Sequence, residues 1–148
     1  MANENTFSGV YPCYENQFKI GTAGAQTLNT IAECVTFGVS FENGVEEWTP
    51  YSSEGWKRRL MTGKGVTITV TAKRCVGDTG NDFVSGLSFK NGRQAECDFE
   101  WTFPDGTVVK FANAVINVKS NGAGDATNVA PLEFDVMSNG KPTVTEPS

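Results

Sequence analysis

Residues 95–103 read AECDFEWTF, a stretch in which apolar and polar side chains alternate without a break. A period of two is typical of a β-strand with one buried face and one exposed face. The dipeptide Asp105-Gly106 follows and leads into a second apolar run. Asp and Gly tolerate the positive φ of a tight hairpin turn. This stretch therefore predicts one strand of an antiparallel hairpin.

The same alternation recurs through most of the chain. It covers residues 34–41, 66–73 and 132–136, and a shorter strand pair is expected at 17–20 and 30–33. Residues 107–119 also alternate, but their apolar positions change parity near Ala112 and Asn113, which predicts a β-bulge there. Further hairpin-type dipeptides are Asn43-Gly44, Asn91-Gly92, Asn121-Gly122 and Asn139-Gly140. We therefore expect an all-β fold, a β-sandwich or a barrel-like sheet.

Two segments depart from the β pattern. Residues 79–87 read TGNDFVSGL and predict one short helix, capped by Thr79 or Asn81. The residues assigned to this helix are Asn81, Asp82, Phe83, Val84 and Leu87. Residues 42–65 are polar and aromatic with no obvious strand pair, and a long loop of that kind is often functional. We expect it to protrude from the sheet.

Composition narrows the class of protein. A chain of 148 residues suits a single domain, expected over residues 1–148 with flexible arms at 1–10 and 138–148. The net charge of -5 argues against wrapping nucleic acid, because that binding depends on cations that neutralise phosphates. The chain has no histidine, which removes the commonest general base and metal ligand. No stretch approaches the ~20 apolar residues of a membrane helix. We expect no enzyme, no cofactor, no metal and no membrane.

Charged residues gather in two places. Lys57, Arg58 and Arg59 follow Trp56, and we expect this basic cluster to form a contact patch. It could pair with Glu46 and Glu47 of a neighbouring copy in a head-to-tail association. The second group is Glu96, Asp98 and Glu100 on one face of the 95–103 strand. A hydrolase would need two such carboxylates across a cleft, but a plain acidic face is the favoured interpretation.

Several motifs together resemble a known family. They are FENGVEEWTPYSSEGWKRRL at 41–60, TGK at 62–64 and GDTGNDFV at 77–84. The end of the chain, a strand at 133–137 and then NGKP at 139–142, is similar as well. Together these resemble the major tail tube proteins of bacteriophages with long, non-contractile tails. The resemblance extends from about Phe18 onward.

The resemblance implies a structural virion protein. Such proteins form hexameric rings that stack into a tail tube, made in the host cytoplasm, through which DNA passes without specific binding. Implied partners are further copies of the chain, a tape measure protein, a tail terminator and distal tail proteins. The contact loop would contain Glu46, Glu47, Trp48, Tyr51, Trp56, Lys57, Arg58 and Arg59. A negative lumen wall would repel phosphates, and its candidate residues are Glu96, Asp98, Glu100, Glu133 and Asp135.

Other functions fit the same strands. A β-sandwich binding module for a carbohydrate or a protein would use Trp48 and Trp56 as stacking platforms. A hydrolase with acidic residues would need a deep cleft with opposed carboxylates. A tube protein of a contractile tail or a secretion system would share the fold of the first candidate.

Overall fold

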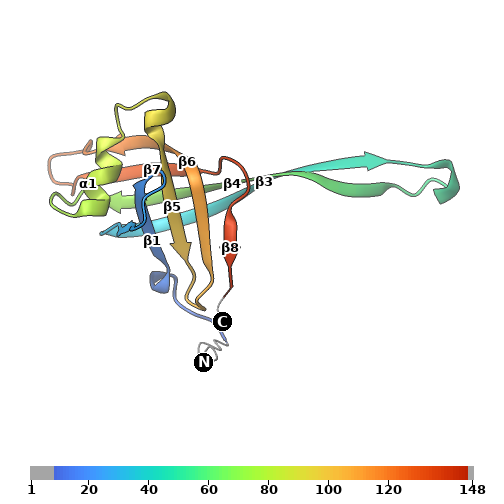
Figure 1. Ribbon diagram of the computed structural model, residues 1–148, viewed down its shortest axis with the longest axis horizontal. Coiled ribbons are helices and arrows are strands. Elements are labelled where there is room, and N and C mark those ends of the chain that lie inside the picture. Colours follow the sequence, from blue (N-terminus) through green and yellow to red (C-terminus); the bar gives the residue numbers. More distant parts are fainter. Residues whose placement is uncertain (1–8, 147–148) are drawn as a thin grey trace.

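The structure is a computed structural model that describes residues 9–146 (Figure 1). It contains one α-helix, α1 (Thr79–Gly86), and three single-turn 3-10 helices, η1 (Cys13–Glu15), η2 (Tyr51–Ser53) and η3 (Gly92–Ala95), within that range. The strands are β1 (Gln17–Thr22), β2 (Asn29–Thr30), β3 (Cys34–Trp48), β4 (Arg58–Lys73), β5 (Glu96–Thr102), β6 (Val108–Asn121), β7 (Pro131–Met137) and β8 (Thr143–Thr145). The all-β prediction with one short helix is confirmed.

All strand pairs are antiparallel, in the order β2-β1-β5-β6-β7-β4-β3, with β8 added to β6. The sheet folds over at the middle of β6. The half before the bend pairs with β5 and β8, and the half from Val115 onward pairs with β7. The bend is the predicted bulge: Asn113 has a φ of 56°, and the register shifts between Cys97 and Phe99 of β5.

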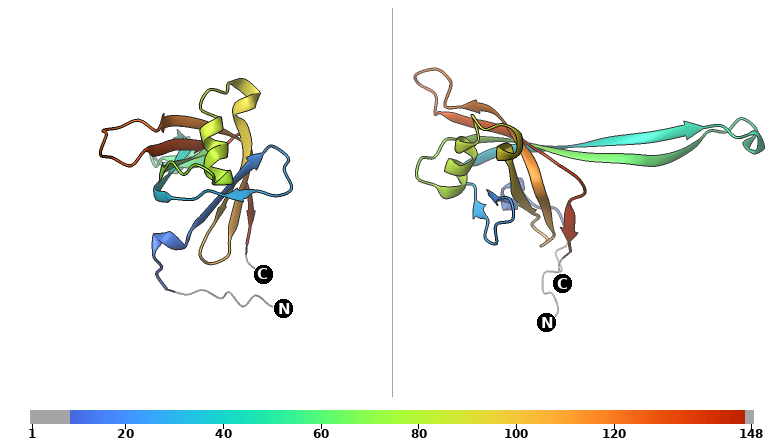
Figure 2. Two further views of the ribbon diagram at one scale, coloured as in Figure 1. Left: turned by 90° about the vertical axis from the view of Figure 1, so that its left-hand side faces the viewer. Right: turned by 45° about the horizontal axis from the view of Figure 1, so that its top comes forward.

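The two halves of the folded sheet share one core (Figure 2). Phe99 and Phe111 come from one half, and Ile68 and Phe134 from the other; all four are buried. Phe37 of β3 closes the seam between the halves, with ring centroids 4.8 Å from Phe18 and 5.6 Å from Trp101, both edge to face. The apolar positions of the alternating stretches that predicted the strands therefore supply the side chains of the core.

The structure corrects the predicted loop at 42–65, which is a hairpin. β3 runs to Trp48 and β4 begins at Arg58, so Asn43 pairs with Lys64 and Gly44 pairs with Gly63. The hairpin-turn prediction at Asn43-Gly44 is wrong for the same reason. Residues 42–65 project far from the sandwich and are called the arm (Figure 1). Both faces of the arm lie outside the sandwich, so no burial enforces the apolar and polar alternation by which a strand is recognised.

Smaller differences concern the ends of elements. The predicted strand at 30–33 is limited to β2, Asn29–Thr30. The helix cap is neither Thr79 nor Asn81: the Asp78 carboxylate accepts from the Asn81 N–H at 2.9 Å. Within the C-terminal segment 138–148, which was expected to be flexible, Thr143–Thr145 pairs with Val108–Lys110 of β6. Of the N-terminal segment 1–10, which was also expected to be flexible, residues 1–8 lie outside the described residues.

Candidate assembly surface

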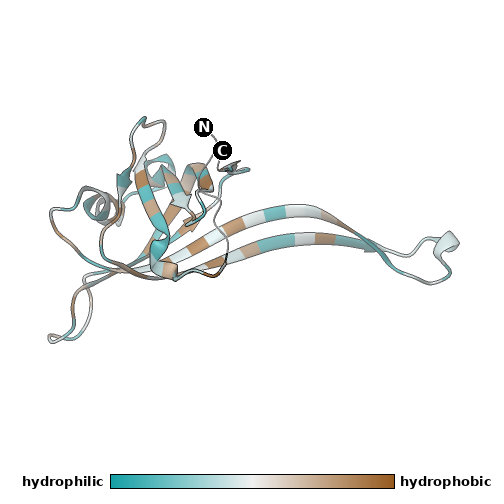
Figure 3. Cartoon of the chain, turned by 90° about the horizontal axis from the view of Figure 1, so that it is seen from below, coloured by the Kyte–Doolittle hydropathy of each residue, from teal (hydrophilic) through white to brown (hydrophobic). Residues whose placement is uncertain are grey.

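The arm is a two-stranded ribbon exposed on both faces. At ~3.3 Å per residue, the run from Glu42 to Trp48 extends about 20 Å before the tip, residues 49–56. Hydrophobic bands follow one another along it (Figure 3). Val45 lies opposite Met61, and Leu60 lies opposite Glu46; all three apolar side chains are exposed. An isolated two-stranded ribbon is marginally stable in water. We therefore expect the arm to be stabilised by contact with another surface.

The charges of the arm are largely used within it. The Glu47 carboxylate lies 3.0 Å from Nε of Arg59 and 3.4 Å from Nζ of Lys57. Hydrogen bonds from Arg59 and then Lys57 lower the pKa of Glu47. Within one chain, cross-strand neighbours therefore satisfy the charge of Glu47, and the expected pairing of the basic cluster with a neighbouring copy stays a prediction. The Glu46 carboxylate, by contrast, makes no hydrogen bond or ion pair with any residue in 9–146.

Aromatic side chains of the contact loop are displayed at and near the tip. Tyr51 is fully exposed and Trp56 is 78% exposed. The guanidinium of Arg58 lies 5.7 Å from the ring centroid of Trp48. The Ser53 hydroxyl lies 2.9 Å from the Pro50 carbonyl oxygen and 2.6 Å from that of Trp56 and can donate to either. These contacts of Ser53 tie the backbone of the tip into a turn.

The five predicted acidic residues do not form one surface. Asp98 is buried in the bulge, where its carboxylate accepts the Gly24 N–H at 3.0 Å and the Asn113 N–H at 3.1 Å. The assignment of Asp98 to an exposed acidic face is wrong, because its carboxylate supplies the acceptor that one backbone donor of the bulge and one of the turn after β1 need. Glu96 and Glu100 lie on β5, and Glu133 and Asp135 lie on β7.

The two acidic pairs belong to opposite outer faces of the sandwich. On β5, Glu96 and Glu100 flank core residues Cys97 and Phe99 and point away from them. On β7, Glu133 and Asp135 alternate with the buried Leu132, Phe134 and Val136. The Asp135 carboxylate lies 3.3 Å from Nζ of Lys119. A single wall can therefore present one acidic pair, not both.

The predicted helix residues have a structural role. Asn81 is fully buried, and its amide oxygen accepts from Nη1 of Arg74 and from the Cys75 N–H, both at 2.9 Å. Its amide nitrogen donates to the carbonyls of Ala32, at 3.1 Å, and Lys73, at 2.9 Å. Val84 is buried, Phe83 packs against the core, and Asp82 pairs with Arg74 at 2.8 Å; Leu87 directly follows the helix. These contacts fasten α1 to the ends of the strands.

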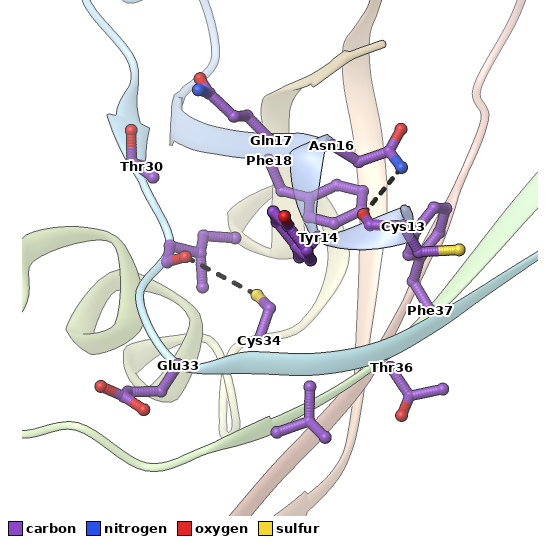
Figure 4. A pocket seen from close by; sticks show the side chains of 12 residues that line it. Cys13, Tyr14, Asn16, Gln17, Phe18, Thr30, Glu33, Cys34, Thr36 and Phe37 are labelled. Atoms are coloured by element: carbon purple, nitrogen blue, oxygen red, sulfur yellow. Dashed lines mark hydrogen bonds between the residues drawn. The ribbon is translucent and has the colours of Figure 1, made fainter. Parts of the chain in front are cut away.

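A pocket of about 390 Å³ lies between η1 and the start of β3 (Figure 4). Its lining contains a single carboxylate, from Glu33, so this pocket lacks the opposed pair that a hydrolase needs. Burial raises the pKa of the Cys34 thiol to about 11, which keeps the thiol protonated and a poor nucleophile.

Residues 9–146 contain neither a metal-binding cluster nor a membrane-spanning helix. No group of three or more Cys, Asp or Glu side chains within that range is arranged to hold a metal ion. Within the same range, no helix has the length and apolar character needed to cross a membrane.

Comparison with known proteins places the fold. No family model and no curated protein matches the sequence. A chain from the tail of an empty gene transfer agent particle, refined with C6 symmetry, is 20% identical with a TM-score of 0.73, over 92% of this chain and 99% of that one. A chain of an extracellular contractile injection system sheath-tube complex is 16% identical with a TM-score of 0.54, over 93% and 92%. The tube-terminating cap of the anti-feeding prophage is 14% identical with a TM-score of 0.58, over 99% of both chains. The fold is thus that of phage-like tail and injection-tube proteins, as the sequence motifs implied.

Proposed function

We propose that this protein is a structural virion subunit that polymerises as stacked hexameric rings into a phage tail tube. The observation that carries the proposal is the arm, which displays Tyr51, Trp56 and several apolar side chains that no described residue covers. A binding module or an enzyme has no need of a long exposed ribbon of this kind. The neighbour from the gene transfer agent tail has the same fold over nearly its whole length and was refined with C6 symmetry.

Ring closure is supported by the edges of the sheet. Beyond its pairing with β4, β3 presents an unpaired edge, and residues 116–121 of β6 pair with β7 alone. The other two edge strands, β2 and β8, have two and three residues. Long open edges invite pairing with another chain, whereas short ones resist it. We propose that β3-β4-β7-β6 joins edge to edge between neighbouring subunits.

In that ring, the outer face of β3, β4 and β7 would line the lumen. It carries the hydroxyls of Thr67, Thr69 and Thr71 beside Glu133 and Asp135. Carboxylates repel phosphates, and Lys119 on this side of the sheet is paired with Asp135. Glu96 and Glu100 would then face outward, where Glu100 lies in register with Lys19 and Lys110. We infer that the lumen acidic residues are Glu133 and Asp135, and that DNA passes them without specific binding.

The remaining expectations follow from this role. The protein would act without catalysis or a cofactor and would reside in the virion after assembly in the host cytoplasm. Its partners would be further copies of itself, a tape measure protein, a terminator and distal tail proteins. A contractile-type tube is the second candidate, supported by the likeness to the injection-system sheath-tube chain. The higher TM-score of the gene transfer agent tail, 0.73 against 0.54, favours the first candidate.

Size-exclusion chromatography and negative-stain electron microscopy at rising concentration test the proposal. The expected result is rings or hollow tubes. The matched control replaces residues 44–63 with Asn-Gly, a two-residue turn that would reconnect Asn43 and Lys64. This variant should keep the sandwich, measured by its thermal transition, and lose assembly. A wild-type protein that stays monomeric at every concentration would contradict the proposal, and saturable binding of a sugar or protein ligand would then favour the binding module.

A further inference from the structure

A groove of about 840 Å³ lies where the arm leaves the sandwich. One wall is Phe41 of β3 together with Met61 and Lys64 of the arm, and the other is the segment after β7, with Pro142 and Val144. This side of the arm continues the row of β3 side chains that forms the core, through Phe37, Val39 and then Phe41. Past the sandwich nothing described covers the row, and Phe41 is 59% exposed.

We propose that this groove receives the arm tip of a second copy of the chain. This inference rests on the proposed function and names the contact by which one subunit engages the next. The tip offers Tyr51 and Trp56, and rigid aromatic side chains entering apolar pockets are the commonest anchors of protein interfaces. Since Ser53 and the left-handed residue Glu54 fix the tip backbone, little conformational entropy is lost on docking.

Charge complements the apolar fit. Glu54 is the one formally charged side chain of the tip, lies between the two aromatic residues, and has no partner in residues 9–146. The groove contributes Lys141, which is exposed and has no partner in that range either. Lys64 adds a second cation, held 3.1 Å from Oδ1 of Asn43 and 5.8 Å from the ring centroid of Phe41. The groove carboxylate, from Glu42, already accepts from the Thr67 hydroxyl at 2.8 Å.

The tip of one chain cannot reach the groove of the same chain, so the contact must form between two copies. The tip points away from the groove of its own chain, and the paired strands between them prevent it from folding back (Figure 1). A surface that binds a different surface on the next copy is heterologous, and repetition of such a contact builds rings or filaments. One tip and one groove in each chain would supply a repeating bond of this kind.

The direct test is disulfide trapping between two different variants. In a Cys13→Ser background, Tyr51→Cys and Val144→Cys are mixed under assembly conditions and oxidised, and cross-linked pairs are resolved without reductant. Bond formation requires Cα atoms within about 7 Å. We expect the mixture to give at least about tenfold more cross-linked pairs than a control of Phe89→Cys with Val144→Cys, because docking raises the effective concentration. Phe89 is exposed and lies outside the arm and the groove.

Charge exchange gives an independent readout. Glu54→Lys alone and Lys141→Glu alone should each raise the concentration needed for assembly about tenfold, and the double variant should restore it. Lys90→Glu, an equal change of charge at an exposed position elsewhere, should leave assembly unchanged.

The outcomes separate the two proposals. Wild-type tubes without a 51–144 cross-link, or with no rescue by the double variant, would overturn the groove inference and leave the proposed function standing. Absence of any assembly would overturn both. If deletion of residues 1–8 leaves tubes intact but opens the groove to solvent in hydrogen exchange, the occupant is that segment and the inference is wrong.

Discussion

Gly80 lies in the first turn of α1, where the helix meets the backbone of residues 30 and 31. A Cβ at position 80 would stand 2.8 Å from the carbonyl carbon of Thr30 and 3.0 Å from Cα of Ile31, and closer still to the Thr30 oxygen. These are backbone atoms, and the Ile31 N–H is bonded to the Phe18 carbonyl at 3.0 Å. The helix cannot retreat either, because the adjacent Asn81 holds it by four hydrogen bonds.

The substitution Gly80→Ala therefore sets two effects against each other. Alanine in a helix gains about 1 kcal/mol over glycine. Overpacking costs about 1–3 kcal/mol, and each hydrogen bond of Asn81 that is loosened costs about 1 kcal/mol more. We expect a net loss of about 2–3 kcal/mol in the free energy of unfolding.

Gly86→Ala is the matched control. Gly86 ends the same helix, a Cβ there meets nothing within 4 Å, and its φ is negative. It should gain about 0.5–1 kcal/mol. At about 2–4 °C per kcal/mol, thermal unfolding followed by tryptophan fluorescence should separate the two variants by roughly 5–15 °C. Equal transition temperatures would refute the argument that the close approach of α1 to β2 is rigid.

Three further predictions concern buried and paired groups. Asn81→Asp keeps the shape of the side chain, but an ionised carboxylate cannot donate the two hydrogen bonds that the amide nitrogen makes to Ala32 and Lys73, so urea unfolding should show a loss of about 2–4 kcal/mol. Asp98→Ala leaves two backbone donors without an acceptor, the Asn113 N–H of the bulge and the Gly24 N–H of the turn after β1, and should cost about 2–3 kcal/mol in the same assay. Burial raises the pKa of Cys97 to about 12, so the stability that its neutral thiol contributes is complete below the ordinary thiol pKa of 9.0 and is lost as pH rises toward 12. The urea midpoint of the wild type should therefore fall more between pH 8 and pH 10.5 than that of Cys97→Ala.

Each of these has a result that would count against it. Wild-type stability in Asn81→Asp would mean that its donors are replaceable by water. An unchanged Asp98→Ala would mean that the bulge does not depend on its carboxylate. Parallel pH profiles for wild type and Cys97→Ala would locate the alkaline loss at other groups.

Sequence reasoning succeeded where burial imposes a pattern. Residues 95–103 were recognisable because every second side chain enters the core, and the parity change near Asn113 gave the bulge. It failed on the arm, where β3 and β4 continue past the core and no burial imposes alternation. In the sequence, Asn43-Gly44 has the residues of a hairpin turn. In the structure, Gly44 is paired with Gly63 across the ribbon, next to a register shift. The sequence also could not show that Asp78 caps the helix, because several adjacent residues have side chains that can form a cap.

Local chemistry, read one segment at a time, determined the strands, the turn at Asp105-Gly106, the helix and the aromatic content of the arm. The tertiary structure alone decided which acidic residues share a face. Glu96, Asp98 and Glu100 look alike in the sequence, yet one is buried in the bulge and the others lie on the face opposite Glu133 and Asp135. The physical reason is that alternation along a strand shows only on which side of the sheet a residue lies. The bend in β6 decides which way that side of the sheet faces in the folded protein.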